Sequence, residues 1–155
     1  MGPGSMAALL EQVAERARQA DVFGAVRLEG DRLVCPARDA AEPAEYRLEW
    51  DGAGRLWVSL VTPNRWLSES IETDLLHTGD KIEELIEDEL VDLGYDGAPP
   101  RVEHFRSDDM LFTFRSALPI GSDAADSARS AATALLAYEA CFRQLGDMSG
   151  GSDED

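Results

Sequence analysis

The chain has little positive charge. Its 155 residues include one lysine and thirteen arginines against 31 aspartates and glutamates, which gives a formal net charge of −17. A protein that binds nucleic acid or an anionic membrane surface needs a basic footprint, so this balance excludes both kinds of partner. The sequence also lacks a signal peptide and any apolar run approaching the ~20 residues of a membrane span. We therefore expect no nucleic-acid partner and no membrane partner.

Cysteine is equally scarce. Cys35 and Cys141 lie far apart and in no CxxC pattern, and two thiols do not make a disulfide framework in a chain of this size. We expect both to be reduced and buried, and the compartment to be cytoplasmic. The sequence also has no nucleotide-binding or nucleophile motif. We therefore expect no cofactor and no catalytic residue.

Composition divides the chain into three parts. Residues 1–5 look like an expression-tag remnant, which we set aside. Residues 6–146 are expected to form a single α+β domain, since a chain that is 44% hydrophobic has enough apolar material for one core. Residues 147–155 hold four acids among serine and glycine. We expect this acidic tail to be disordered, because it has almost nothing to bury.

Alternating apolar and polar residues predict a series of hairpins. The clearest spans residues 46–61, where Tyr46 and Leu48 share one face of the first strand. Two further hairpins are predicted over 25–36 and 101–116. The tryptophans are expected in the core or on a face of the sheet: Trp50, Trp57 and Trp66.

Apolar residues at helical spacing predict three helices: 6–20, 80–93 and 123–145. Residues 66–77 favour a helix and permit a strand. The whole pattern predicts an α+β fold, in which an antiparallel sheet of about five to six strands is built from hairpins. The sheet would be flanked by the N-terminal helix, an acidic central helix and a long alanine-rich C-terminal helix.

Most of the net negative charge lies in one segment that contains the central helix. Residues 66–96 include eleven acids and one lysine, which supplies ten of the seventeen net negative charges. The helix is expected to begin at a capping box formed by Asp80 and Glu83. One of its faces gathers four acids around an apolar residue: Glu83, Glu84, Glu87, Asp88 and Val91. This face is either a solvated surface or a docking surface that attracts a basic protein partner.

The C-terminal helix carries an apolar seam with alternating spacings of three and four residues. The seam comprises Ala128, Ala131, Leu135, Tyr138, Phe142 and Leu145. Its second half holds the large side chains Leu135, Tyr138 and Phe142. The seam either packs on the protein's own sheet or contacts a partner or a second copy of the chain.

The strongest pattern for metal chemistry is the spacing of Asp74, His77 and Asp80. Two carboxylates and an imidazole suit a hard or borderline metal ion. The same residues are also suited to helix ends, where His77 would favour the helix dipole and Asp80 would cap the next helix. Both interpretations stay open.

The order of helices and strands, the acidic balance and the apolar helix Asp123–Leu145 together resemble the class I type III secretion chaperones and the related YbjN-like proteins. The resemblance covers about residues 6–145. It implies an α+β fold, non-enzymatic protein binding and a homodimer. In such chaperones a partially extended partner segment lies along sheet and helix surfaces.

These observations favour a non-catalytic protein-binding module that is chaperone-like or adaptor-like. We expect it to dock a partner through the C-terminal helix or a sheet edge, with the acidic helix steering a basic partner. The alternative function is a small metal-dependent or hydrolytic enzyme that uses Asp74, His77 and Asp80.

Overall fold

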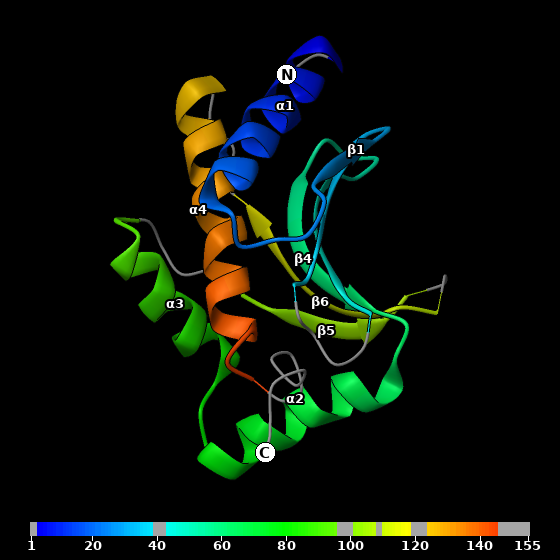
Figure 1. Cartoon of the computed structure of the whole chain (residues 1–155), viewed down its shortest axis with the longest axis vertical. Coiled ribbons are helices and arrows are strands. Elements are labelled where there is room, and N and C mark those ends of the chain that lie inside the picture. Colours follow the sequence, from blue (N-terminus) through cyan, green and yellow to red (C-terminus); the bar gives the residue numbers. More distant parts are fainter. Residues whose placement is uncertain (1–2, 39–42, 96–100, 108–109, 119–123, 146–155) are drawn as a thin grey trace.

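The computed structural model describes residues 3–38, 43–95, 101–107, 110–118 and 124–145. It has four helices and one six-stranded antiparallel sheet, which confirms the predicted α+β class (Figure 1). The predicted acidic tail, 147–155, lies outside the described residues. The elements in chain order are α1 (Pro3–Ala20), β1 (Arg27–Glu29), β2 (Arg32–Pro36), β3 (Glu45–Trp50), β4 (Leu56–Thr62), α2 (Arg65–Thr78), α3 (Ile82–Asp92), β5 (Glu103–Arg106), β6 (Phe112–Leu118) and α4 (Ala124–Phe142).

The strands form one sheet in the order β1-β2-β3-β4-β6-β5. The three predicted hairpins supply the pairs β1–β2, β3–β4 and β5–β6. The β4–β6 pair joins β1–β4 to the β5–β6 hairpin, and the helices α2 and α3 lie between these two parts in the sequence. The long central strands β4 and β6 therefore hold together segments that are far apart in the sequence.

Alternation along each strand decides which face is covered. On β3, Tyr46, Leu48 and Trp50 are buried, and Arg47 and Glu49 between them are only partly buried. The buried side chains pack under α1 and α4, which lie side by side on this face of the sheet (Figure 1). We call this the helix-covered face, and the opposite one the polar face.

The second half of α4 lies in the centre of the core. Leu135, Tyr138 and Phe142 are each 0% exposed. The Tyr138 and Phe142 rings pack together, and Phe142 also packs on Phe114 of β6. The expectation that these three residues form a docking surface is therefore corrected, because the seam is used to bury the helix on the protein's own sheet.

Residues 66–77 form a helix, as the apolar spacing favoured. In α2 the side chain of Asn64 accepts a hydrogen bond from the Leu67 N–H at 2.8 Å, which caps the N-terminus. Gly79 ends the helix in the left-handed conformation, at φ 78°, and its N–H bonds to the Leu75 carbonyl. The predicted position of Trp66 is wrong, since it lies on this helix and is 74% exposed.

The predicted capping box at the start of the acidic helix is also wrong. Helix α3 begins at Ile82 with Lys81 as its N-cap, and the Lys81 side chain makes no cap hydrogen bond. The Glu83 carboxylate instead accepts a hydrogen bond from the Val102 N–H at 3.2 Å. Glu83 thus makes a tertiary contact with the residue before β5 in place of the predicted local contact with Asp80.

Both cysteines are free and buried, as expected. Burial raises the pKa of each thiol to about 12. In the part of the chain that the structure describes, no helix is long and apolar enough to cross a membrane.

Candidate functional site

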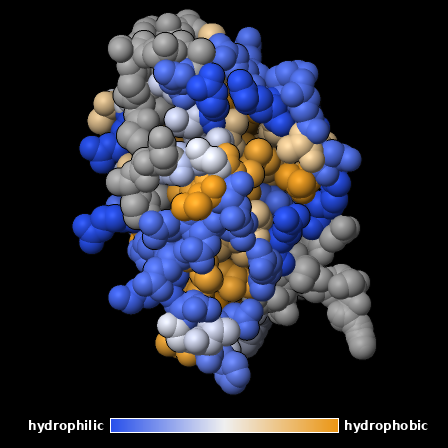
Figure 2. Space-filling view, turned by 90° about the vertical axis from the view of Figure 1, so that its left-hand side faces the viewer, coloured by the Kyte–Doolittle hydropathy of each residue, from blue (hydrophilic) through white to orange (hydrophobic). Residues whose placement is uncertain are grey.

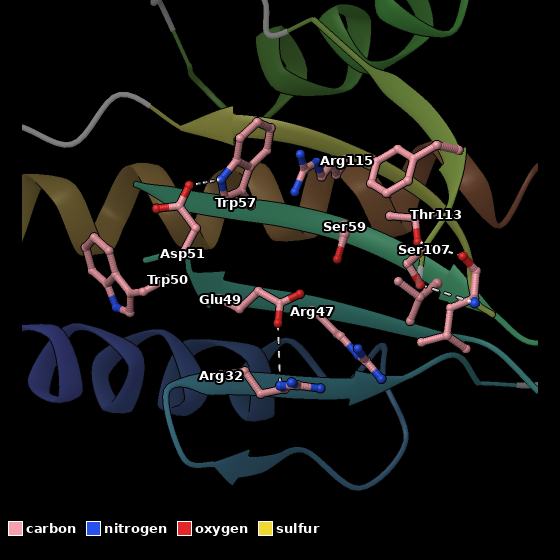
Figure 3. Close-up of a pocket in the computed structure, with 13 residues that line it drawn as sticks. Arg32, Arg47, Glu49, Trp50, Asp51, Trp57, Ser59, Ser107, Thr113 and Arg115 are labelled. Atoms are coloured by element: carbon pink, nitrogen blue, oxygen red, sulfur yellow. Dashed lines mark hydrogen bonds and ion pairs between the residues drawn. The ribbon is translucent and has the colours of Figure 1, made fainter. Parts of the chain in front are cut away.

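The polar face of the sheet carries a hollow of about 280 Å³, which we call the sheet-face hollow. Its lining includes three arginines, namely Arg32, Arg47 and Arg115, together with Ser59 and Trp57. In Figure 3 the helices lie behind the sheet and these side chains stand in front of it. The hollow is thus on the opposite side of the sheet from the core.

Ser59 lies at the centre of this hollow. It pairs with Arg47 on one side and Arg115 on the other, so the three residues form one cross-strand row on β3, β4 and β6. Ser59 is only 2% exposed, and among the described residues its hydroxyl has no hydrogen-bond partner. A buried hydroxyl without a partner costs about 1–3 kcal/mol. The small side chain also leaves the space that forms the hollow.

Each flanking arginine donates to a glutamate, on the same strand for Arg47 and on the neighbouring strand for Arg115. Arg47 donates from Nε and Nη2 to Oε1 of Glu45, at 2.9 and 2.6 Å. Arg115 donates from Nε to Glu103 at 3.0 Å, and its guanidinium carbon lies 3.8 Å from the centroid of the Trp57 ring. These contacts restrain both guanidinium groups beside the hollow.

The β3–β4 turn fixes the tryptophan. The Trp57 indole N–H donates to one carboxylate oxygen of Asp51 at 2.9 Å, and the other oxygen accepts the N–H groups of Ala53 and Arg55. These bonds, with the indole bond the largest, lower the pKa of the Asp51 carboxyl. A turn residue thus sets the position of the ring on which Arg115 stacks.

A second concavity of about 430 Å³ lies between α2, the start of α3 and β5; we call it the α2–α3 groove. Its lining is mainly apolar and includes Leu75, Leu76, Ile82, Val102 and Phe114. Leu76 is 84% exposed, so most of its apolar surface is open to a partner. Two carboxylates, Glu72 and Asp80, also line the groove.

His104 lines the groove beside these apolar residues. Its ring stacks on Phe114 with centroids 3.8 Å apart. Its Nε2 lies 3.3 Å from the Ser68 hydroxyl and 3.4 Å from the Glu72 carboxylate. Burial lowers the pKa of His104, and the Glu72 charge opposes this shift.

The contacts of His104 do not have the arrangement of a catalytic triad. A triad uses one ring nitrogen for the serine and the other for the acid. Here Ser68 and Glu72 both contact Nε2, and Ser68 is buried. The cluster therefore fastens β5 to α2.

The groove reaches α3 only at its start, at Ile82, and the acidic residues singled out on this helix are not part of the lining. Glu84, Glu87 and Asp88 are exposed, and Glu83 is partly buried against Val102. Val91 is 62% exposed. Figure 2 faces the side of the molecule on which α3 lies, and it shows hydrophobic patches interrupted by hydrophilic residues. The structure thus exposes four of the five α3 residues of the predicted docking surface.

The alternative metal site is not supported. Among the residues that the structure describes, no three acidic, histidine or cysteine side chains are placed to hold a metal ion. Asp74 and His77 lie on α2, but Gly79 turns the chain before Asp80. The regular spacing of the three residues therefore does not bring them together.

Sequence analysis missed both concavities. The available signal for the sheet-face hollow was polar residues at alternate positions of neighbouring strands, as in Arg47, Ser59 and Arg115. Only the register of the sheet places these residues in one row. The signal for the groove was Leu76, an apolar residue of α2. The groove itself lies between elements whose relative placement the sequence does not give.

No protein-family model, no curated protein and no solved structure matches this chain.

Proposed function

We propose that the chain is a non-catalytic protein-binding module, chaperone-like or adaptor-like, that docks a basic and partly apolar partner segment in the α2–α3 groove. The observation that carries the proposal is the apolar lining of this groove, in which Leu76 is exposed and Leu75, Ile82 and Val102 are partly buried, within a strongly acidic part of the chain. We further propose that it acts in the cytoplasm without a cofactor.

The apolar lining supplies the binding free energy. Exposed Leu76 and partly buried Leu75 offer surface that a partner's apolar side chains would remove from water. Burying one large aliphatic side chain contributes about 1.5–3 kcal/mol. Binding an amphipathic segment in such a groove is a common mode of peptide recognition.

The negative charge around the groove favours a partner segment with positive charge. Glu72 and Asp80 line the groove, and Glu84, Glu87 and Asp88 are exposed on the neighbouring helix. Lysine or arginine side chains flanking the apolar residues of the segment would meet these carboxylates. Such complementarity increases the association rate and disfavours acidic competitors.

The experiment uses two fluorescein-labelled 18-residue peptides with identical leucines at helical spacing. One carries lysine at its polar positions and the other carries glutamate. We expect fluorescence anisotropy to show binding of the lysine peptide only, with an affinity that falls as NaCl rises from 50 to 300 mM. Equal binding of both peptides contradicts the proposal.

Variants separate the apolar and charged contributions. Leu76→Ser should raise the Kd of the lysine peptide roughly tenfold at either salt concentration. Glu84→Lys/Glu87→Lys should raise it roughly five- to tenfold at low salt and less at high salt. The matched controls are Leu28→Ser and Glu11→Lys/Glu15→Lys, which alter exposed residues on β1 and α1. An equal effect of test and control variants would sink the assignment of the groove.

The resemblance to secretion chaperones also leads us to propose a homodimer. Sedimentation of the full chain tests this against its 16.9 kDa monomer mass. If Leu76→Ser dissociates a dimer, a second copy occupies the groove and the basic partner segment is wrong.

A further inference from the structure

We propose that the sheet-face hollow binds a monocarboxylate with an apolar body, and that the carboxylate is held by the Ser59 hydroxyl and the flanking guanidinium groups of Arg47 and Arg115. The proposal does not depend on the α2–α3 groove, because no residue lines both concavities.

The first argument is the unpartnered hydroxyl. Ser59 is 2% exposed and its Oγ has no hydrogen-bond partner within the described ranges. Buried hydroxyl groups in folded proteins almost always have a partner. Figure 3 shows the Ser59 side chain in the middle of the hollow, between Arg47 and Arg115. A ligand oxygen in the hollow would give the hydroxyl its missing acceptor.

The second argument is the orientation of the two arginines. Glu103 contacts Arg115 at Nε, and Glu45 contacts Arg47 at Nε and Nη2. Among the described residues, these contacts leave both Nη groups of Arg115, and Nη1 of Arg47, for a further acceptor. The stacking of Arg115 on Trp57 at 3.8 Å fixes the plane of its guanidinium. A planar carboxylate suits such a fixed fork.

The third argument concerns the charge of the ligand. The lining has three arginines and the acids Glu49 and Asp51, and Glu45 and Glu103 pair with two of the arginines. These four carboxylates outnumber the three guanidinium groups, so the hollow has no surplus of positive charge. This balance strongly disfavours a phosphate dianion, and a monocarboxylate would be held by directed hydrogen bonds rather than by net charge. The negative charge on the rest of the chain is screened beyond about 8–10 Å at physiological salt.

The fourth argument concerns the rest of the ligand. Val61, Phe105 and Leu111 line the hollow beside the arginine row. Val61 pairs with Thr113 in the register, one same-face position along from Ser59. An alkyl or aryl group attached to the carboxylate would lie on these side chains. The chemical class is therefore an apolar monocarboxylate, either a small acid or the C-terminal carboxylate of a peptide that ends in an apolar residue.

The test is an NMR titration of the ¹⁵N-labelled full chain in 150 mM NaCl. The probes are 4-phenylbutanoate and the tetrapeptide Ac-Ala-Ala-Ala-Phe with a free carboxylate, each beside its uncharged amide. The reporter is the Trp57 indole N–H, assigned with Trp57→Phe. We expect a saturable shift with at least one acid, with a Kd on the order of millimolar for a ligand of this size. Saturation by 4-phenylbutanoate alone assigns a small acid, and tighter binding of the peptide acid assigns a chain terminus.

Variants test whether the ligand that shifts the Trp57 indole signal binds at the row of Arg47, Ser59 and Arg115. Ser59→Ala should raise the Kd at least about fivefold without lowering the melting temperature, because it removes an unpartnered hydroxyl. Arg115→Gln should raise the Kd roughly tenfold, and Arg115→Lys should restore only part of the loss because lysine has no fork. The control Arg65→Gln, an exposed arginine on α2, should change the Kd less than about twofold.

Three results would overturn the proposal. One is a Kd of the amide equal to that of its acid. Another is an unchanged Kd in Ser59→Ala and Arg115→Gln when both variants are folded by circular dichroism. The last is inorganic phosphate binding with equal or higher affinity and the same dependence on Ser59 and Arg115.

Discussion

The two faces of the sheet are made from alternate residues of the same strands. Both are buried along β4, and they differ in the side chains that surround these residues. On β4, Val58 and Leu60 of the helix-covered face are 0% exposed under α1 and α4. Ser59 between them faces the arginine row on the other side. One face is stabilised by packing of apolar surface, and the other combines paired charges with a hollow.

The comparison shows that burial has different consequences on the two faces. Ser116 on β6 is buried on the helix-covered face, and its hydroxyl lies 2.5 Å from that of Tyr138. Ser59 is buried on the polar face without a partner among the described residues. The Ser116 hydroxyl is thus satisfied within the core, whereas the Ser59 hydroxyl is left for an acceptor from outside the described chain.

The largest expected difference between the faces is in packing. Leu48→Ala should lower the free energy of unfolding by about 2–5 kcal/mol, because it leaves a cavity under the helices. Its neighbour Glu49 faces the other side and forms a partly exposed ion pair with Arg32 at 3.4 Å. Glu49→Gln should cost less than about 1 kcal/mol. Urea unfolding followed by circular dichroism measures both, and equal losses would contradict the division into two faces.

The next difference is between the two buried serines. Ser116→Ala leaves the buried Tyr138 hydroxyl without its partner and should cost about 1–3 kcal/mol. Ser59→Ala should be neutral or stabilising in the absence of ligand. The same urea experiment compares them directly. A loss in Ser59→Ala as large as in Ser116→Ala would show that the Ser59 hydroxyl is already satisfied, for instance by water.

A smaller effect concerns pH and His104, which stacks on Phe114 at the end of the sheet. Burial holds its pKa below the usual value near 6.5. The unfolded chain therefore takes up the proton first as the pH falls below about 6.5, and stability is lost in that range. Above this range the histidine is neutral in both states and has no effect.

The variant His104→Gln isolates this effect from that of the many carboxylates. Between pH 7.5 and pH 5.5 the native chain should lose more stability than the variant does. The measurement is the urea midpoint at each pH. A steeper loss in the variant would mean that the Glu72 charge, not burial, controls the imidazole.

The smallest effect is expected for the charge pairs of the polar face. Arg115 and Glu103 are joined at 3.0 Å with side chains 34% and 53% exposed. A double-mutant cycle with Arg115→Gln and Glu103→Gln should give a coupling free energy of about 0.2–1 kcal/mol that falls with salt. A much larger coupling would mean that the polar face, and not only the helix-covered face, is needed for folding.

Much of the architecture could be predicted because its signals are local. Strict alternation over Tyr46 to Trp50 gave the strand and its buried face, and spacing of four residues at Leu67, Ile71 and Leu75 favoured the helix α2. The left-handed conformation at Gly79 ended that helix where expected. These features depend on residues within one or two turns of each other.

The site could not be predicted, because its signals are not local. The spacing of the large residues of α4 was compatible with a core seam and with a docking surface. Only the packing of α4 on the sheet showed that these residues belong to the core. Glu83 had a capping partner available nearby but bonds to Val102, nineteen residues away. The regular spacing of Asp74, His77 and Asp80 did not predict a shared site, because α2 ends at Gly79 and Asp80 lies beyond the helix.

The sequence by itself determined the α+β class, the hairpins and the concentration of negative charge in residues 66–96, because periodicity and charge are properties of contiguous segments. Only the tertiary structure decided that Arg47, Ser59 and Arg115 form one row, and that Leu76 stands exposed beside an apolar groove. The physical reason is that register and helix docking join residues across 12 to 68 positions of chain, and the free energy that selects those pairings comes from burial of the whole core.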